Sequence, residues 1–161
     1  MLYTCGIIIT KIVERYRKRK TVKVILASDH AGFKLKEAIK KFLVKKRKKV
    51  LDLGTKNTSS VDYPDYAHLL SKKINKSENK FGILVCGTGI GMSMAANKHK
   101  NIRAALCYDS KSAKMSRKHN NANVITIGAR LTKKNVALKC VNIFLNTNFL
   151  GGRHKRRINK I

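Results

Sequence analysis

The feature that most constrains the fold is a regular alternation of short apolar runs with longer amphipathic segments. The apolar runs lie at 22–30, 50–54, 81–87, 102–108 and 123–129. The segments that follow them, at 31–49, 63–75, 91–99, 109–120 and 132–146, carry apolar residues at mostly helical spacing. Runs that are apolar along nearly their whole length indicate parallel strands buried on both faces. We therefore predict an α/β fold, a three-layer sandwich around a five-stranded parallel sheet, Rossmann-like and doubly wound.

Local signals mark the starts of the predicted helices. Pro64 lies near the start of the second helical segment, and Asp65 falls in its first turn, where an acid meets the helix dipole favourably. Asp109 or Ser110 is expected to cap the fourth helix. Thr132 opens the fifth helical segment.

The chain of 161 residues suits a single domain with one core. We expect this α/β domain to cover residues 21–161 and to end in a basic tail. Residues 1–20 are expected to form an extension, disordered or helical, that takes no part in the alternation. No apolar run approaches the roughly 20 residues that span a bilayer, so no membrane segment is expected.

The formal net charge of +29 at pH 7 admits two interpretations. Clustered basic side chains bind nucleic acid by releasing counterions from its phosphates. Lysine, however, greatly outnumbers arginine, which is the better reader of bases and phosphates, and the basic residues spread over nearly every segment. We interpret the charge as a bias of composition, and nucleic acid is not expected as a functional partner.

The four cysteines, Cys5, Cys86, Cys107 and Cys140, form no CxxC pair and have no histidine at the spacing of a metal site. Three of them lie in or beside apolar runs, which is typical of free thiols in a reducing compartment. We expect a cytoplasmic protein without a metal, in which most of the thiols are core residues.

Polar and reactive residues follow three of the predicted strands at the point where each strand ends. Residues 28–30 (Ser-Asp-His) follow the first, 86–88 (Cys-Gly-Thr) the third and 108–109 (Tyr-Asp) the fourth. Open parallel sheets bind ligands at the carboxyl ends of their strands. The sequence therefore predicts a site at this edge of the sheet.

The glycine-rich turn after the third strand has two possible ligands. Its glycines, Gly87, Gly89 and Gly91, match a dinucleotide fingerprint only in part, because Met92 occupies the place of the third glycine. Asp109 lies near the distance expected for the acid of such a site. A Walker loop is excluded because no Gly-Lys-Ser/Thr follows.

The same turn also suits chemistry by a thiol. Backbone N–H groups that gather at a strand end and a helix start stabilise negative charge, so they would favour the thiolate of Cys86. They would equally stabilise an oxyanion on a bound substrate, and a base beside an oxyanion hole suits proton abstraction next to a carbonyl. On the residues alone, an enzyme site is favoured over a nucleotide site and over a purely structural turn.

The tail after Gly151 and Gly152 is strongly basic. Arg153 and Arg157 lie four residues apart and share one face if the segment is helical, so the pair could grip one phosphate. The other interpretation is a solvated basic tail.

Six ordered motifs together resemble the type B ribose-5-phosphate isomerases, a family shared with the galactose-6-phosphate isomerase subunits. The motifs are SDHAGFKLK (28–36), DLGT (52–55), VDYPDYA (61–67), CGTGIGMSMAANK (86–98), RKHNNANVITIGAR (117–130) and GGRHKRR (151–157). The resemblance covers about residues 22–161. It implies interconversion of ribose 5-phosphate and ribulose 5-phosphate through an enediolate, without metal or cofactor. It also implies a homodimer, or a tetramer, with each pocket completed across the interface.

The resemblance implies roles for residues of the glycine turn. Cys86 looks like the base that moves a proton between C2 and C1, and Thr88 like its hydroxyl neighbour. The amides of Gly87, Gly89 and Gly91 would form an anion hole. Some family members use a glutamate base, but the turn here contains none, which leaves Cys86 as the candidate.

The remaining implied roles concern ring opening, substrate binding and support of the turn. His119 would open the furanose ring, and Asp29 would hold a substrate hydroxyl and assist ring opening. Asn120 would bind a sugar oxygen, and Tyr63 would line the pocket. The phosphate would be bound by His30, Arg153 and Arg157, and Asn97 would support the glycine turn. His119 and the arginine pair are expected to come from the partner subunit.

Two alternatives remain beside this reading. One is an isomerase of a six-carbon sugar phosphate such as allose 6-phosphate or galactose 6-phosphate. The galactose-6-phosphate subunits tend to lack either the Cys-Gly-Thr-Gly turn or the His-Asn pair, whereas this chain has both, which favours the pentose phosphate. The other alternative is a basic α/β protein that binds nucleic acid.

Overall fold

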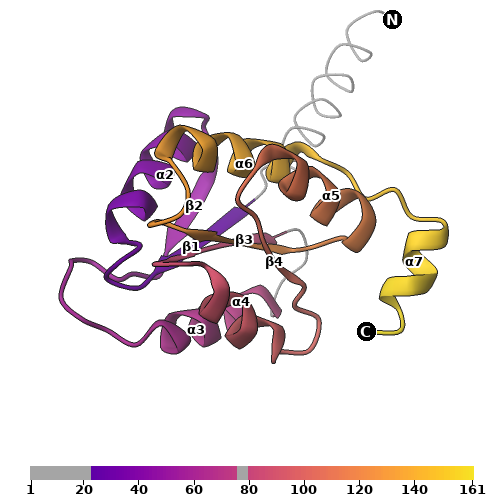
Figure 1. The fold of residues 1–161 in the computed structure, drawn as a ribbon, viewed down its shortest axis with the longest axis horizontal. Helices are drawn as coiled ribbons and strands as arrows, with labels where there is room; N and C mark the ends of the chain where they lie inside the picture. Colours follow the sequence, from indigo (N-terminus) through magenta and orange to yellow (C-terminus); the bar gives the residue numbers. More distant parts are fainter. Residues whose placement is uncertain (1–22, 76–79) are drawn as a thin grey trace, which may run out of the picture.

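The computed structural model of the chain describes residues 23–75 and 80–161 (Figure 1). The strands are β1 (Lys23–Ser28), β2 (Lys49–Asp52), β3 (Lys80–Cys86), β4 (Ala104–Leu106) and β5 (Val124–Gly128). The helices are α2 (Phe33–Lys45), α3 (Tyr63–Asn75), α4 (Ile90–Asn97), α5 (Ser110–Asn120), α6 (Lys134–Asn146) and α7 (Arg153–Ile158). The extension predicted at 1–20 lies outside the described residues.

The described strands form one parallel sheet in the order β2-β1-β3-β5-β4. Helices α2, α5 and α6 cover one face of this sheet, and α3 and α4 cover the other, as Figure 1 shows. The predicted three-layer α/β sandwich with a doubly wound, five-stranded parallel sheet is therefore confirmed.

Each face of the sheet packs against its own apolar cluster, because successive side chains of a strand point to opposite faces. In β3, Ile83 and Val85 belong to the cluster under α2, α5 and α6. Leu84 and Cys86 belong to the cluster under α3 and α4. The side chain of Cys86 therefore points to the face that α4 covers.

The connections create a switch point between β1 and β3. From β1 the chain passes through α2 to β2 at one edge of the sheet, whereas from β3 it passes through α4 to β4 at the opposite edge. Because α2 and α4 lie on opposite faces (Figure 1), the loops after these neighbouring strands separate. Open α/β sheets bind their ligands at such a point.

The ends of the helices follow the local signals in part. Asp109 caps α5 in a capping box: its carboxylate accepts a hydrogen bond from Ser112 N at 2.7 Å, and the Ser112 hydroxyl accepts one from Asp109 N at 3.3 Å. The first predicted helix, 31–49, is shorter in the structure. It ends at Lys45 because Arg47 adopts a left-handed φ of 54° and turns the chain into β2.

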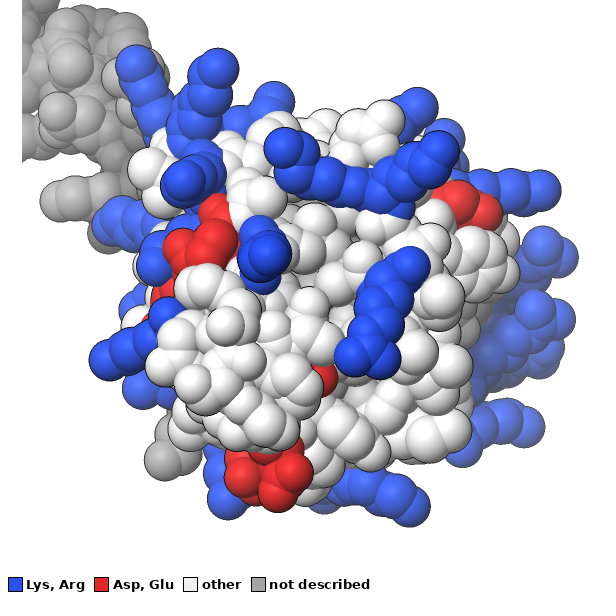
Figure 2. All heavy atoms as spheres, turned by 60° about the vertical axis from the view of Figure 1, so that its left-hand side comes forward, with Lys and Arg blue, Asp and Glu red and all other residues white. Residues whose placement is uncertain are grey.

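Basic side chains dominate the surface. Figure 2 shows lysine and arginine around the whole outline of one face, with few carboxylates and an uncharged area between them. This spread fits a bias of composition better than a single basic groove. Within 23–75 and 80–161, no helix is long and apolar enough to cross a bilayer.

Candidate active site

A hollow of about 250 Å³ opens at the carboxyl ends of β1 and β3. Its walls come from the ends of these strands, the start of α3, the glycine turn and the loop after β5. The lining residues are Asp29, His30, Ala31, Tyr63, Cys86, Gly87, Thr88, Gly91 and Arg130. All of them except Ala31 and Arg130 are site residues predicted from the sequence, and the predicted edge of the sheet carries a concave site.

Cys86 ends β3, and its sulfur lies beside the glycine turn. The residue is 4% exposed, and its Sγ accepts a hydrogen bond from the backbone N–H of Gly89 at 3.1 Å. Gly89 has a φ of 80°, and a Cβ there would stand 2.6 Å from Cδ1 of Leu106, so only glycine fits. The turn thus directs a main-chain donor at the sulfur, which is the contact that an anionic sulfur needs.

The ring of Tyr63 packs directly on the glycine turn. A Cβ at Gly91 would lie 2.6 Å from two ring carbons of Tyr63, so the absence of a side chain there lets the ring approach. Tyr63 is the first residue of α3 and forms a wall of the hollow. Thr88, at the tip of the turn, is exposed, and its hydroxyl accepts a weak hydrogen bond from Ile90 N at 3.3 Å.

Asp29 and His30 follow β1 and are held by main-chain contacts. Oδ1 of Asp29 accepts a hydrogen bond from Gly32 N at 2.8 Å, and Asp29 N donates to Val85 O at 3.2 Å, which ties the residue to β3. The Nδ1 atom of His30 lies 3.2 Å from N and 3.3 Å from O of Val61. These contacts fix both side chains in the wall of the hollow, close to the end of β3.

Arg130 is a site residue that sequence analysis missed. Its backbone N–H donates to Gly87 O at 2.9 Å, which fastens the loop after β5 to the glycine turn. Its guanidinium atoms lie 3.4 Å from the position that a Cβ would take at Gly87. A permanent positive charge therefore stands against the turn. The sequence offers one indication of this role, because Arg130 is the last residue of the 117–130 motif and follows a predicted strand at the same edge of the sheet.

A second group of predicted residues is not among those that line the hollow. His119 lies in the last turn of α5, and its ring stacks on the ring of His154 in α7, with centroids 4.3 Å apart and planes 9° apart. Burial, followed by the charges of His119, Arg153 and Arg157, lowers the pKa of His154. The basic tail does form a helix, α7, and Figure 1 shows it at the end of the molecule away from α2. Asn120, Arg153 and Arg157 therefore belong to this group.

Asn97 contacts β4 instead of the glycine turn. Its amide nitrogen donates to Ala104 O at 2.9 Å, and its Oδ1 accepts from Ala104 N at 2.8 Å. The hydroxyl of Ser93 makes a longer contact with the same carbonyl at 3.4 Å. Asn97 thus fixes the end of α4 to the sheet, and any support that it gives to the turn passes through that helix.

The other described thiols differ from Cys86 in their surroundings. Burial raises the pKa of Cys107, and burial raises the pKa of Cys140 to about 11. Both residues belong to the apolar cluster under α2, α5 and α6. Among the cysteines of the described ranges, Cys86 alone lines the hollow, so it is the thiol available for chemistry.

Asp109, the acid that a dinucleotide site would use, has a structural role in this chain. Hydrogen bonds from the backbone and hydroxyl of Ser112 lower the pKa of Asp109, and the carboxylate is engaged in capping α5. This capping role accounts for the place of Asp109 at the start of α5 without a nucleotide. In the part of the chain that the structure describes, no group of three or more His, Cys, Asp and Glu side chains is arranged for a metal ion.

Comparison with known proteins decides between the remaining interpretations. A family model described as Ribose/Galactose Isomerase matches residues 24–161. The chain belongs to the ribose/galactose isomerase family. The ribose-5-phosphate isomerase B of Escherichia coli is 40% identical over 139 residues, which cover 86% of this chain and 93% of that protein. A probable ribose-5-phosphate isomerase B of Mycoplasma genitalium is 46% identical over 140 residues, covering 86% and 92%.

Solved structures of this isomerase family share the fold. A ribose 5-phosphate isomerase of Thermotoga maritima superposes with a TM-score of 0.85 at 51% identity, covering 86% of this chain and 96% of that one. The ribose-5-phosphate isomerase B of Mycoplasma genitalium, with ribulose-5-phosphate bound, gives 0.83 at 44% identity, covering 86% and 92%. The resemblance to the type B isomerases that the sequence predicted is therefore confirmed, and the nucleic-acid alternative is not favoured.

Proposed function

We propose that this isomerase interconverts ribose 5-phosphate and ribulose 5-phosphate through an enediolate, with Cys86 as the base. Relatives named ribose-5-phosphate isomerase B match most of the chain, and one of them was solved with ribulose-5-phosphate bound. The observation that carries the proposal is the position of Cys86, which lines the hollow and whose Sγ accepts a hydrogen bond from Gly89 N at 3.1 Å. A thiol with a purely structural role would have no such opening beside it.

The reaction moves protons only, so it needs no electron carrier. In the open-chain aldose the Cys86 thiolate removes the proton from C2, the C2–H electron pair forms the C1=C2 bond, and the carbonyl electrons move to O1. A proton then passes from O2 to O1. Finally the O2 electrons form the C2 carbonyl, the C1=C2 electrons take the proton back from sulfur at C1, and the thiolate is restored.

The glycine turn stabilises the charge that develops on oxygen. The N–H of Gly89 donates to the Cys86 sulfur, whereas those of Gly87 and Gly91, at the junction of β3 and α4, lie where fixed main-chain dipoles favour an oxyanion. Thr88 places a hydroxyl beside this hole and suits the proton transfer between O2 and O1. Gly32 N occupies Oδ1 of Asp29, which leaves the other carboxylate oxygen to accept a hydrogen bond from a substrate hydroxyl.

Binding of the phosphate needs cationic side chains, and ring opening needs an acid–base group. We infer that residues outside the hollow of a single chain complete both. Within the hollow, His30 and Arg130 supply positive or hydrogen-bonding groups for anionic oxygens. We assign ring opening to His119, a sugar contact to Asn120, and the phosphate to Arg153 and Arg157 of the partner subunit in a homodimer.

The surface near the hollow supports such a dimer. Ile90 and Met94 lie four residues apart on one side of α4 and are 45% and 66% exposed. Tyr108 and Leu131, which follow β4 and β5 at the same edge of the sheet, are 64% and 68% exposed. Large apolar side chains exposed beside a site are typical of a surface that a partner covers. A reducing compartment, the cytoplasm, suits the buried free thiols.

Cys86→Ala tests the proposed base in a coupled assay with ribose 5-phosphate. The kcat is expected to fall by about 10²–10⁴-fold while ribose 5-phosphate still raises the melting temperature. Cys107→Ala is the matched control, because it removes a thiol that is buried away from the hollow, and it should retain the wild-type KM. Allose 6-phosphate is assayed in parallel. Unchanged turnover in Cys86→Ala contradicts the base, and faster turnover of allose 6-phosphate by the wild type contradicts the pentose assignment.

Mixing two inactive variants tests the shared site. If each site combines Cys86 of one subunit with His119 of the other, a dimer of one Cys86→Ala and one His119→Ala chain contains one intact site. Random exchange of subunits should therefore restore about a quarter of wild-type activity. A mixture that stays inactive after exchange has been verified by mass contradicts the shared site.

A further inference from the structure

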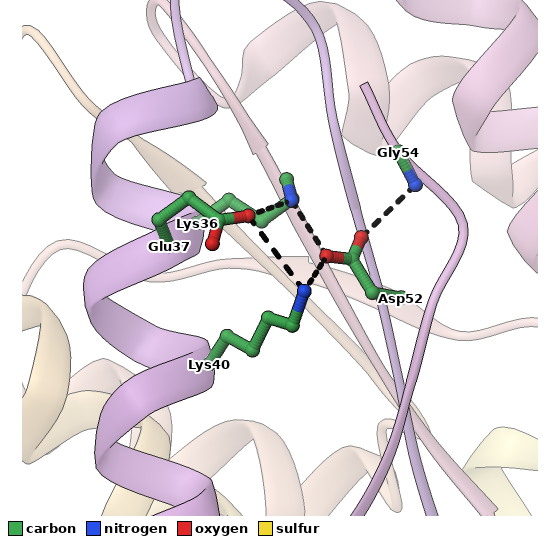
Figure 3. Close-up of polar contacts among 5 residues, drawn as sticks. All are labelled: Lys36, Glu37, Lys40, Asp52 and Gly54. Atoms are coloured by element: carbon green, nitrogen blue, oxygen red, sulfur yellow. Dashed lines mark hydrogen bonds and ion pairs between the residues drawn. The ribbon is translucent and has the colours of Figure 1, made fainter. Parts of the chain in front are cut away.

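A charged cluster outside the proposed site joins α2 to the end of β2. Lys36 Nζ lies against a carboxylate oxygen of Glu37 and 2.8 Å from Oδ2 of Asp52, and Lys40 Nζ lies 2.7 Å from the same Oδ2 (Figure 3). Oδ1 of Asp52 accepts a hydrogen bond from Gly54 N at 3.0 Å. Every charged side chain of the cluster thus has a partner, and Asp52 joins the two lysines.

Lys36 is unusual because its side chain is 1% exposed. Lysine is almost never fully buried unless it is paired, since moving a charge out of water is costly. Lys40, in contrast, is 39% exposed beside a surface hollow of about 360 Å³. Burial alone would raise the pKa of Asp52, but the hydrogen bonds from Lys36 and Lys40 outweigh it and hold the pKa below its ordinary value. The aspartate is therefore an anion fixed between two ammonium groups.

The cluster connects to the proposed site through the main chain. Gly54, which donates to Asp52, accepts a hydrogen bond from Ser28 N through its carbonyl at 2.7 Å, and Thr55 N donates to Ser28 O at 2.8 Å. Ser28 is fully buried at the end of β1 and directly precedes Asp29. The carboxylate of Asp52 thus fixes the loop at Gly54 and Thr55, and this loop in turn is hydrogen-bonded to the end of β1.

A second connection runs along α2. Lys36 N donates to Gly32 O at 2.9 Å, and Gly32 N donates to Oδ1 of Asp29 at 2.8 Å. The side chain of Lys36 fastens this first helical turn to Asp52 at the end of β2. Asp29 and His30 therefore lie on a short segment whose two ends, Ser28 and Gly32, are both tied to the Lys36–Asp52 pair.

We propose that Lys36 and Asp52 are positioning residues, which hold Asp29 and His30 in register with Cys86 across the switch point. A purely structural ion pair would stabilise the fold without setting the geometry of the hollow. The inference rests on the proposed function, because Asp29 and His30 are assigned there to the substrate. Its specific content is that the pair acts on catalysis through Asp29.

Lys36→Met is the informative variant, because it removes the ammonium group and keeps an apolar stem of similar length, while Lys40 still neutralises Asp52. We expect kcat/KM for ribose 5-phosphate to fall at least about tenfold at temperatures where the variant is fully folded, since small misplacements of binding groups are costly in catalysis. Lys40→Met is the matched control from the same cluster. Its kcat/KM should stay within about twofold of wild type, because Lys40 is partly exposed and its ion pair with Asp52 is therefore weaker than that of Lys36.

A double-mutant cycle separates positioning from general destabilisation. If Lys36 acts through Asp29, then Lys36→Met should add little further loss in an Asp29→Asn background. The amide resonances of Asp29 and Gly54 should also shift in Lys36→Met, which reports the geometry without any assay. A lowered melting temperature with unchanged kcat and KM overturns the proposal, and so does full additivity of the two losses.

Asp52 provides a second test if Lys36→Met does not fold. Asp52→Asn keeps an oxygen for Gly54 N, whereas Asp52→Ala removes it, so the alanine variant should lose more of its kcat/KM. Equal activities of the two folded variants overturn the proposal. The wild type and Cys86→Ala are assayed beside them. A wild type that does not isomerise ribose 5-phosphate refutes the proposed function, whereas an active wild type with an unaffected Lys36→Met refutes the positioning role.

Discussion

The guanidinium of Arg117 is buried between α5, the end of α6 and two aromatic rings, and replacing it with methionine is predicted to destabilise the fold. Nη1 donates to Ala122 O at 2.6 Å and to Oδ1 of Asn121 at 2.9 Å, and Nε donates to Thr147 O at 3.2 Å. The group also lies 4.6 Å from the ring centroid of Phe81. Arg117 thus ties the last turn of α5 to the segment that follows it and to the end of α6.

Two opposing terms set the magnitude. Burial, with a smaller contribution from the charge of Arg103, lowers the pKa of Arg117 to about 10, and a shift of this size corresponds to a desolvation cost of about 3 kcal/mol, which the methionine variant recovers. Against this, three hydrogen bonds from a charged donor contribute about 1.5–3 kcal/mol each, less where water replaces them, and the ring contact about 1 kcal/mol. The loss exceeds the gain, and we expect a net destabilisation of about 2–4 kcal/mol, or a drop in Tm of about 5–15 °C.

Urea and thermal unfolding followed by circular dichroism measure this effect. Lys114→Met, an exposed substitution on the same helix, is the control and should change stability by less than about 0.5 kcal/mol. Arg117→Lys keeps the charge but not the fork, so it should fall between the two. Because His119 lies two residues further on, the methionine variant should also lose activity. An Arg117→Met protein as stable as Lys114→Met would refute the reasoning.

Two further predictions concern the glycine turn and a histidine pair. Gly89→Ala should lower Tm more than Gly151→Ala. Both glycines have a positive φ, but a Cβ at Gly89 would lie 2.6 Å from Leu106, whereas nothing lies within 4 Å of a Cβ at Gly151. Equal melting temperatures of the two variants would contradict this prediction. The Nδ1 of His68 lies 2.7 Å from Nε2 of His99, and burial, followed by the charges of His68 and Lys72, lowers the pKa of His99. The unfolded chain then binds this proton more readily, so the stability contribution is full above the ordinary histidine pKa and is lost as the pH falls below about 6.5. His99→Gln should flatten that part of the Tm profile, and an equally steep profile in the variant would contradict the assignment.

The alternation of apolar runs was sufficient to predict the sheet and its layers, because both depend on local periodicity and on the rules of parallel connections. It also predicts which strand ends meet, and so places Asp29 and Cys86 at one edge of the sheet. The end of α2 was missed, since the lysine-rich sequence after Lys45 favours helix and only the entry into β2 stops it at Arg47.

Other parts of the site depend on contacts between distant segments, which no local pattern reports. Arg130 reaches the glycine turn because its backbone N–H donates to Gly87 O just beyond the ends of the neighbouring strands β3 and β5. Asn97 was expected at the turn, but its amide matches the main chain of Ala104 on β4. The burial of Lys36 follows from packing against a residue 16 positions away, which the sequence shows only as one lysine among many.

The fate of the hydrogen on C2 of ribose 5-phosphate tests the central role of Cys86 most directly. With substrate deuterated at C2, the wild type should show a primary isotope effect on turnover and release deuterium to solvent or deliver it to C1. Cys86→Ala should bind the sugar phosphate and leave the deuterium on C2. Loss of deuterium from C2 in Cys86→Ala, at a rate comparable with wild type, would contradict the account, because another group would then be the base.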